Sequence, residues 1–253
     1  RRVTRANIDY CFPHRPTAWR KGMARRSLIE LGKTVSEIGP LWRWDGERVM
    51  DLVKGVTGEE AVREAMQAGR GVIMLGPHLG AWEMVGLYCS RHFPITSLYA
   101  PPRMEALDAP MREARERMGA RLVPTDAGGV RALARSLRNG EMAGILPDQT
   151  PRRGQGEFAP FFGHPAYTMV LASKLAAKSG AAVFFTFAER LPRGRGFHMH
   201  FIPAEPEIAS RDLNESLAAL NRGVEACIER APEQYQWSYK RFRERPEGEE
   251  SIY

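Results

Sequence analysis

Apolar positions follow two different spacings along this chain, and the two alternate. Short runs of β-branched and other apolar residues predict buried strands, because these side chains fit a pleated sheet that is covered on both faces. Segments in which apolar residues recur every three or four positions predict helices. The predicted strands are residues 72–75, 95–99, 122–123, 142–146, 181–188 and 197–202. The predicted helices are residues 28–38, 57–69, 84–89, 104–118, 130–138, 168–179 and 213–228.

This alternation with short connections predicts an α/β fold: a mostly parallel central sheet flanked by helices on both faces. A chain of 253 residues can bury a sizeable core. No internal repeat, low-complexity tract or linker interrupts the sequence, so we expect a single domain over residues 1–253. The stretch before residue 168 is rich in proline and glycine and is predicted to be a long loop. In open parallel sheets, active sites lie beyond the carboxyl ends of the strands.

One predicted strand end carries a histidine. The segment Gly76–Glu83 follows the strand at residues 72–75, and it places His78 at a strand-to-helix corner with Glu83 five residues later. Five helical positions amount to about 140° of rotation, so the two side chains can meet only if His78 precedes the helix and Glu83 lies in its early turns.

A neutral imidazole is a competent general base, and a carboxylate on its other nitrogen would fix the tautomer. No serine or cysteine adjoins His78, which favours activation of a substrate hydroxyl. The alternative is a capping histidine, with Glu83 placed by the helix dipole.

Two further strand ends carry polar side chains. Tyr99 and Arg103 bracket the end of one predicted strand, and Asp148 and Gln149 follow another. Because these ends share one edge of a parallel sheet, we expect the side chains to converge near His78. The alternative is that Arg103 is a solvated helix-start residue and Asp148 a turn former.

Composition narrows the class of protein. The hydrophobic share of 43% and the charged share of 26% are ordinary for a soluble globular domain. The net charge of +7 predicts an acidic partner, which could be nucleic acid, an anionic membrane or an acidic carrier protein. The basic residues are dispersed and no nucleic-acid motif is present, so we expect no nucleic-acid partner. Cys11, Cys89 and Cys227 lie far apart without metal or redox spacing, which suits a reducing compartment.

No run of residues approaches the roughly 18 apolar positions that a spanning helix needs, and no signal-peptide pattern is present. The chain opens on Arg1-Arg2 without a methionine. We therefore expect an N-terminal membrane-anchoring segment to be missing from this chain.

Taken together, the motifs resemble those of the lauroyl/myristoyl acyltransferases of lipid A biosynthesis, late acyltransferases of the lysophospholipid acyltransferase superfamily. Gly76–Glu83 is similar to the family's H-x-x-x-x-E block, with Leu79 and Ala81 where phenylalanine and asparagine are commoner. The other similar blocks follow in order along the chain: Arg1–Pro13, Tyr99–Arg103, Gly129–Arg135 with Leu146–Gln149, Gly156–Thr168 and Tyr235–Arg243.

The resemblance implies a glycerol-3-phosphate acyltransferase-like fold and an enzyme of lipopolysaccharide biosynthesis. Such an enzyme moves a fatty acyl group from acyl carrier protein to a hydroxyl of a lipid A precursor at the cytoplasmic face of the bacterial inner membrane, without cofactor or metal. By motif, His78 would be the general base and Glu83 its orienting partner. The residues that would line the substrate site are Tyr99, Arg103, Asp148 and Gln149.

Basic and aromatic residues outside these motifs extend the prediction. Arg131, Arg135 and Arg138 recur at helical spacing and form one basic face, and Arg152 and Arg153 add charge near Asp148. These five arginines would contact the carrier protein or lipid phosphates; the alternative is solvated surface charge.

Phe158, Phe161 and Phe162 would cap the core or form an acyl channel or membrane contact. His198 and His200 share a strand face, but without a third ligand we expect a structural role and no metal.

Other classes of function fit part of this pattern. A thioesterase would use the same histidine and acyl donor with water as the acceptor. A mannoside or other glycolipid acyltransferase would use acyl-coenzyme A as the donor. A basic module without catalysis would bind a membrane or nucleic acid; it is disfavoured because the basic residues are dispersed and no nucleic-acid motif is present.

Overall fold

The computed structural model describes residues 1–102 and 104–253. Seven strands form a central sheet in the order β1-β9-β8-β2-β5-β3-β4. Neighbouring strands are parallel except β8 and β9, which pair antiparallel. The strands are β1 (Val53–Thr57), β2 (Val72–Leu75), β3 (Ile95–Tyr99), β4 (Arg121–Pro124), β5 (Met142–Ile145), β8 (Ala182–Arg190) and β9 (Phe197–Pro203). This confirms the predicted mostly parallel α/β sheet.

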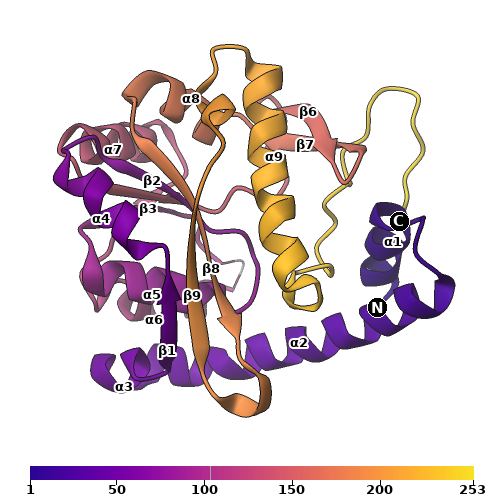
Figure 1. Cartoon of the computed structure of the whole chain (residues 1–253), viewed down its shortest axis with the longest axis horizontal. Helices are drawn as coiled ribbons and strands as arrows, with labels where there is room; N and C mark the ends of the chain where they lie inside the picture. The colour runs from indigo at the N-terminus through magenta and orange to yellow at the C-terminus, as the bar shows by residue number, and fades with distance from the viewer. Residues whose placement is uncertain (103) are drawn as a thin grey trace.

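Helices cover both faces of this sheet (Figure 1). The α-helices are α1 (Arg2–Cys11), α2 (Thr17–Arg43), α3 (Gly46–Met50), α4 (Glu59–Gln67), α5 (Trp82–His92), α6 (Asp108–Glu116), α7 (Ala127–Arg138), α8 (Leu171–Ser179) and α9 (Leu213–Arg230). The 3₁₀-helices are η1 (Glu105–Leu107), η2 (Pro192–Gly194), η3 (Pro206–Ala209) and η4 (Pro232–Gln234). No helix in the described ranges is long and apolar enough to cross a membrane.

The central strand β2 explains how the two cores arise. All four of its residues are buried. Because successive side chains of a strand point to opposite faces, Ile73 and Leu75 join the core under α7, α8 and α9, whereas Val72 and Met74 join the core under α4 and α5. An uninterrupted apolar run is therefore what this position requires.

Two parts of the sheet structure differ from the sequence prediction. The region predicted as a long loop contains a hairpin, β6 (Gly156–Phe161) and β7 (His164–Met169), and α8 begins only at Leu171. Phe162 and Gly163 connect the strands, and both have positive φ angles (49° and 77°), as a tight two-residue turn needs. Pro160 and Pro165 made this stretch resemble a loop, but they pair with each other across the hairpin.

Strand β1 was also not predicted. It contains two glycine or lysine positions among five residues and is only partly buried, so it lacks the apolar run by which the other strands are recognised. Its last residue, Thr57, was assigned to the following helix, whereas α4 begins at Glu59 after a left-handed Gly58.

The two ends of the chain pack against each other. The Asn7 side-chain amide of α1 donates hydrogen bonds to the carbonyls of Trp237 (2.8 Å) and Tyr239 (2.7 Å). The long helix α2 runs below α5 and α6 in the view of Figure 1, the tip of the β8–β9 hairpin extends past it, and α1 lies beside its N-terminal part. The C-terminal segment after η4 is thereby held next to the carboxyl edge of the sheet.

Candidate active site

The register of β2 against β5 brings His78 to Asp148. Leu75 and Ile145 are partners in these parallel strands, and His78 and Asp148 each lie three residues beyond them. Two side chains at equal distances past paired strand ends lie opposite each other at the carboxyl edge of the sheet, where open α/β sheets place their sites.

Asp148 holds His78 at two points. His78 Nδ1 lies 2.8 Å from one carboxylate oxygen of Asp148, and the backbone N–H of His78 donates to the other oxygen at 2.9 Å. Asp148 is 3% exposed. Burial alone would raise the pKa of this carboxyl group, but the His78 ring and the hydrogen bonds from His78 favour the charged form, and the pKa is lowered. With Nδ1–H donating to Asp148, the lone pair of Nε2 is left to accept a proton.

Gln149 occupies the proton-accepting side of the ring. Its side-chain nitrogen lies 3.2 Å from His78 Nε2 and also donates to the Gln236 side-chain oxygen at 3.1 Å. An amide N–H that donates to Nε2 agrees with a neutral ring protonated at Nδ1. The Gln149 amide therefore lies where a substrate hydroxyl would bind.

Glu83 has partners other than the one expected. In the first turn of α5, its carboxylate accepts hydrogen bonds from both the Nε (3.0 Å) and an Nη of Arg115, and from the indole N–H of Trp42 (3.3 Å). Among the described residues, no hydrogen bond joins Glu83 to His78. Glu83 was expected to orient His78. In the structure, Asp148 contacts the imidazole ring instead, and Glu83 binds Arg115. The reason is direction: His78 faces the end of β5, whereas Glu83 faces α6.

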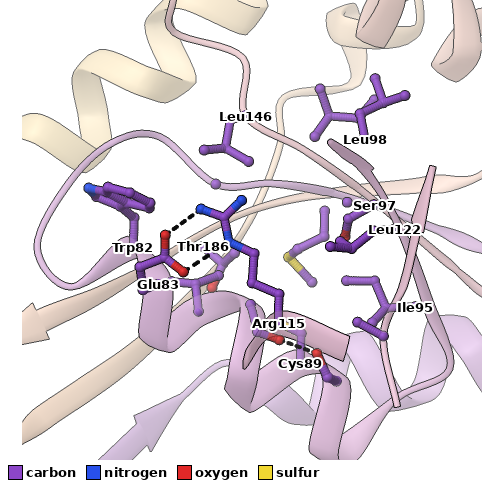
Figure 2. Close-up of a pocket in the computed structure, with 18 residues that line it drawn as sticks. Trp82, Glu83, Cys89, Ile95, Ser97, Leu98, Arg115, Leu122, Leu146 and Thr186 are labelled. Atoms are coloured by element: carbon purple, nitrogen blue, oxygen red, sulfur yellow. Dashed lines mark hydrogen bonds and ion pairs between the residues drawn. The ribbon is translucent and has the colours of Figure 1, made fainter. Parts of the chain in front are cut away.

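Glu83 and Arg115 lie at the edge of an apolar cavity (Figure 2). The cavity lies between α5, α6 and the carboxyl ends of β2, β3 and β5. Trp82 lines this cavity and also the small pocket that contains His78, so the two spaces adjoin through one indole ring. The largely apolar lining includes Met74, Val85, Ile95, Leu98, Leu122, Ile145 and Leu146.

Helix α5 leaves this cavity open at Gly86. A Cβ atom built on Gly86 would meet no atom within 4 Å outside its own helix. Any larger residue at this position would extend into the free space, so the glycine keeps the cavity wide.

The segment after η4 lies outside the sheet and is hydrogen-bonded to the strand-to-helix corner that contains His78 and Gly80. The Gln236 backbone N–H donates to the His78 carbonyl at 3.0 Å, and Gly80 N–H donates to the Gln234 carbonyl at 3.1 Å. Further along, the Thr150 N–H donates to the Tyr239 hydroxyl at 3.0 Å. The sequence identifies this tail only as a motif, because nothing local indicates contact with residues so far away in the chain.

Gly80 shows how closely the corner at His78 approaches strand β8. Its φ angle is +61°, and an added Cβ would come within 2.0 Å of the Ala188 carbonyl oxygen. Only glycine fits this position.

Tyr99, predicted to line the site, bonds to α6 and not to His78. The Tyr99 hydroxyl donates to Asp108 at 2.7 Å, and burial together with this hydrogen bond raises its pKa to about 12. Its ring lies beneath the guanidinium groups of Arg112 and Arg115, so Tyr99 connects β3 to α6. Arg103 lies outside the described residues.

The five other predicted arginines are exposed. Arg131, Arg135 and Arg138 lie along one face of α7, and Arg152 and Arg153 follow Asp148. Arg153 pairs with Glu244 at 3.3 Å. All five can reach a partner in solution, but none contacts His78.

The remaining candidate side chains have contacts within the protein. Phe161 is 1% exposed and Phe162 packs on Trp237, so both cap the core, whereas Phe158 is 37% exposed. His198 bonds to Thr57 (2.8 Å) and His200 to Glu189 (2.9 Å). Within residues 1–102 and 104–253, no group of three or more ligating side chains is placed to hold a metal ion.

The site therefore combines two features of one enzyme class. His78, held at Nδ1 by a carboxylate, has an Nε2 that can take the proton of a hydroxyl group. The neighbouring cavity offers the apolar surface that a hydrocarbon chain would cover. Together they fit an acyltransferase, in which a hydroxyl is activated beside an acyl chain.

Comparison with known proteins gives the family. The model for bacterial lipid A biosynthesis acyltransferases matches residues 1–244. The chain belongs to this family and is an acyltransferase, which confirms the resemblance read from the motifs.

Individual relatives agree over most of the chain. The lipid A biosynthesis palmitoleoyltransferase of Escherichia coli K12 is 30% identical over 252 residues, which are 99% of this chain and 81% of that protein. The lipid A biosynthesis lauroyltransferase of the same organism is 28% identical over 253 residues, 100% of this chain and 82% of that protein. A phosphatidylinositol mannoside acyltransferase of Mycobacterium tuberculosis H37Rv is 31% identical over 158 residues, 60% of this chain and 49% of that protein.

Proposed function

We propose that this protein transfers a fatty acyl group from acyl carrier protein to a hydroxyl of a lipid A precursor, with His78 as the general base. The observation that supports this most strongly is the contact of His78 Nδ1 with the buried carboxylate of Asp148 (2.8 Å). It leaves Nε2 as the only ring nitrogen able to take a proton. Asp148 is the positioning residue and stabilises the imidazolium that forms.

The reaction begins when the acceptor hydroxyl replaces the Gln149 amide at His78 Nε2. His78 takes the hydroxyl proton while the oxygen attacks the carbonyl carbon of the acyl thioester. The tetrahedral intermediate collapses as its C–S bond breaks, and the carrier thiolate receives the proton from His78. One ester bond forms, one thioester bond breaks, and the histidine returns to its neutral form.

In this proposal the acyl chain lies in the apolar cavity, with the thioester near Trp82. Arg115 is held at the cavity edge by Glu83. Burial alone would lower the pKa of Arg115, but the hydrogen bonds and charge of Glu83 favour the cation, and the pKa is raised. Arg115 is thus a fixed positive donor near the thioester. Glu83 acts through Arg115 and serves as a positioning residue for the donor.

The basic surface supports an acidic donor and a phosphorylated acceptor. Arg131, Arg135 and Arg138 are the carrier contacts that we propose, because they are exposed on one face of α7. The proposed setting is the cytoplasmic face of the bacterial inner membrane, where an acceptor lipid and a soluble carrier can both reach the site.

An alternative function is supported by the match to one of the relatives. The match to a phosphatidylinositol mannoside acyltransferase over 158 residues makes a glycolipid acceptor with an acyl-coenzyme A donor the alternative. A thioesterase would use the same His78–Asp148 pair with water in place of the acceptor.

One experiment separates these three functions. The purified protein is incubated with a mixed pool of acyl carrier proteins or with acyl-coenzyme A, together with a Kdo-bearing lipid A precursor or a phosphatidylinositol mannoside. Mass spectrometry then follows the lipid product and the free fatty acid. We expect the lipid A precursor to gain one acyl group from the carrier. Preferred use of acyl-coenzyme A with the mannoside, or release of fatty acid alone, would contradict the proposal.

A further inference from the structure

A cationic groove lies between α1 and α2 and is separate from the pocket that contains His78. Four basic side chains line it: Arg1, Arg5, Lys21 and Arg25. Its remaining lining is apolar and consists of Ala24, Leu28 and Ile29. Figure 1 shows α1 beside the N-terminal part of α2, so the groove runs where the two helices face each other.

Among the described residues, no acidic partner balances the charge of this groove. No acidic residue belongs to its lining, and none of the four basic side chains forms an ion pair in the part of the chain that the structure describes. Lys21 and Arg25 are four positions apart on α2, and Arg5 on α1 lies four positions after the N-cap residue Arg1, a spacing at which like charges repel. An anion bound between the helices would relieve this repulsion.

Exposed apolar side chains continue from the groove along α2. Ile29 is 51% exposed and Val35 is 62% exposed. At 100° per residue, both lie on the side of α2 that carries Lys21 and Arg25. A helix face with basic residues beside exposed aliphatic ones is typical of segments that lie in a membrane interface.

This face is close to the catalytic pocket. Leu28 lines the groove, and Leu31 and Thr34, on the adjoining side of α2, line the pocket that contains His78. A membrane bound along α2 would therefore lie against the helix that also lines the pocket containing His78.

From these contacts we infer that the α1–α2 groove is an anionic-phospholipid site: lipid phosphates bind Arg1, Arg5, Lys21 and Arg25, while Ile29 and Val35 enter the apolar part of the bilayer surface. Nucleic acid would pair with the cations but would leave Ile29 and Val35 in water. An anionic lipid covers both, and the charge alone contributes about fivefold in affinity for each basic side chain at the surface.

Sedimentation with vesicles tests the charged part of this inference. Wild-type protein should bind vesicles of phosphatidylethanolamine and phosphatidylglycerol more tightly than vesicles of phosphatidylcholine. The double variant Arg5→Gln with Arg25→Gln should bind the anionic vesicles about 25-fold more weakly. The matched control, Arg131→Gln with Arg135→Gln on α7, removes the same charge elsewhere and should bind like the wild type. Equal losses in the two variants, or no loss in either, would overturn the groove as the site.

A fluorescent label tests the apolar part. The protein's own Cys11, Cys89 and Cys227 are buried, so an NBD label can be placed on Ile29→Cys or, for comparison, on Phe158→Cys. The label at position 29 should shift to shorter wavelength and brighten on anionic vesicles, and that at position 158 should not. A response at position 158 alone would place the membrane contact on the β6–β7 hairpin and overturn the inference. Both experiments measure binding without acyl transfer, so their failure is distinct from failure of the proposed reaction.

Discussion

Asp148 contacts both the ring and the backbone N–H of His78, and this double contact follows from the pairing of Leu75 with Ile145 in the sheet. A carboxylate that accepts from two groups of one residue restrains both the position of the backbone and the rotation of the ring. The histidine is therefore oriented before any substrate binds, which is the arrangement that an effective general base requires.

Removal of Glu83 should weaken the packing of Arg115 and should leave the orientation of His78 unchanged. In Glu83→Ala, the Arg115 guanidinium loses its carboxylate partner, and we expect a loss of about 1.5–3 kcal/mol in the free energy of unfolding, the usual contribution of a hydrogen bond to a charged group. Arg115→Ala should cost a similar amount, because the buried Glu83 carboxylate is left without its cation. Urea unfolding of both variants and of the double variant measures the coupling.

The double variant should be less destabilised than the sum of the two single variants. Additive losses between Glu83 and Arg115, together with a strong coupling between Glu83 and His78, would show instead that Glu83 acts on the histidine.

Substitution of Gly86 should change the acyl chain that the enzyme prefers. A leucine side chain at this position would extend into the apolar cavity, where a Cβ meets no atom within 4 Å. Each buried CH₂ group that no longer fits costs about 0.8 kcal/mol, or about fourfold in preference. A competition between carrier-bound acyl chains of different length, read by mass spectrometry, should therefore move toward shorter chains in Gly86→Leu. Gly86→Ala is the control and should move the ratio much less; an unchanged ratio in Gly86→Leu would place the chain elsewhere.

Gln149 should protect the donor from water. Its amide bonds to His78 Nε2, so water cannot take that place until the acceptor displaces it. A neutral hydrogen bond contributes about 0.5–1.5 kcal/mol, and we expect Gln149→Ala to raise donor hydrolysis about 2- to 10-fold when no acceptor is present. Gln236→Ala, which removes only the second partner of Gln149, should have a smaller effect. Free thiol released from the acyl carrier protein gives the rate, and a fall in hydrolysis would contradict this role.

The contribution of Asp148 to stability should be lost at acid pH. Because the folded protein lowers the pKa of this carboxyl group below its ordinary 3.8, its stabilising effect is fully present above the unfolded pKa and is lost as the pH falls through the lower folded pKa. The difference in unfolding free energy between wild type and Asp148→Asn should be present at about pH 5 and should shrink as the pH falls below about 4. A difference that instead grows on acidification would mean that the carboxyl group is protonated in the folded state.

The sequence alone predicted those parts of the fold that depend on local pattern. β2 and β5 are apolar throughout, and the position of His78 beyond β2 follows from that pattern. The β6–β7 hairpin was missed because its prolines and glycines are also typical of loops, and its alternation of buried and exposed residues is short.

The partners within the site depend on information that a single sequence does not carry. Asp148 meets His78 through strand register, and Glu83 meets Arg115 across α5 and α6, which are 32 residues apart at these positions. The sequence placed His78, Asp148 and Gln149 at one edge of the sheet, but which carboxylate faces the imidazole is decided by packing.

In the proposed reaction, His78, oriented by Asp148, removes the proton from the acceptor hydroxyl. The most direct test is the rate of acyl transfer at saturating substrates for His78→Ala, Asp148→Asn and the double variant, each first shown to be folded. We expect His78→Ala to lower kcat by at least the 10²- to 10⁴-fold that general-base catalysis contributes. Because the two residues act as one unit, the double variant should be little worse than His78→Ala alone. Near wild-type turnover in His78→Ala, or losses for His78 and Asp148 that simply multiply, would contradict the account.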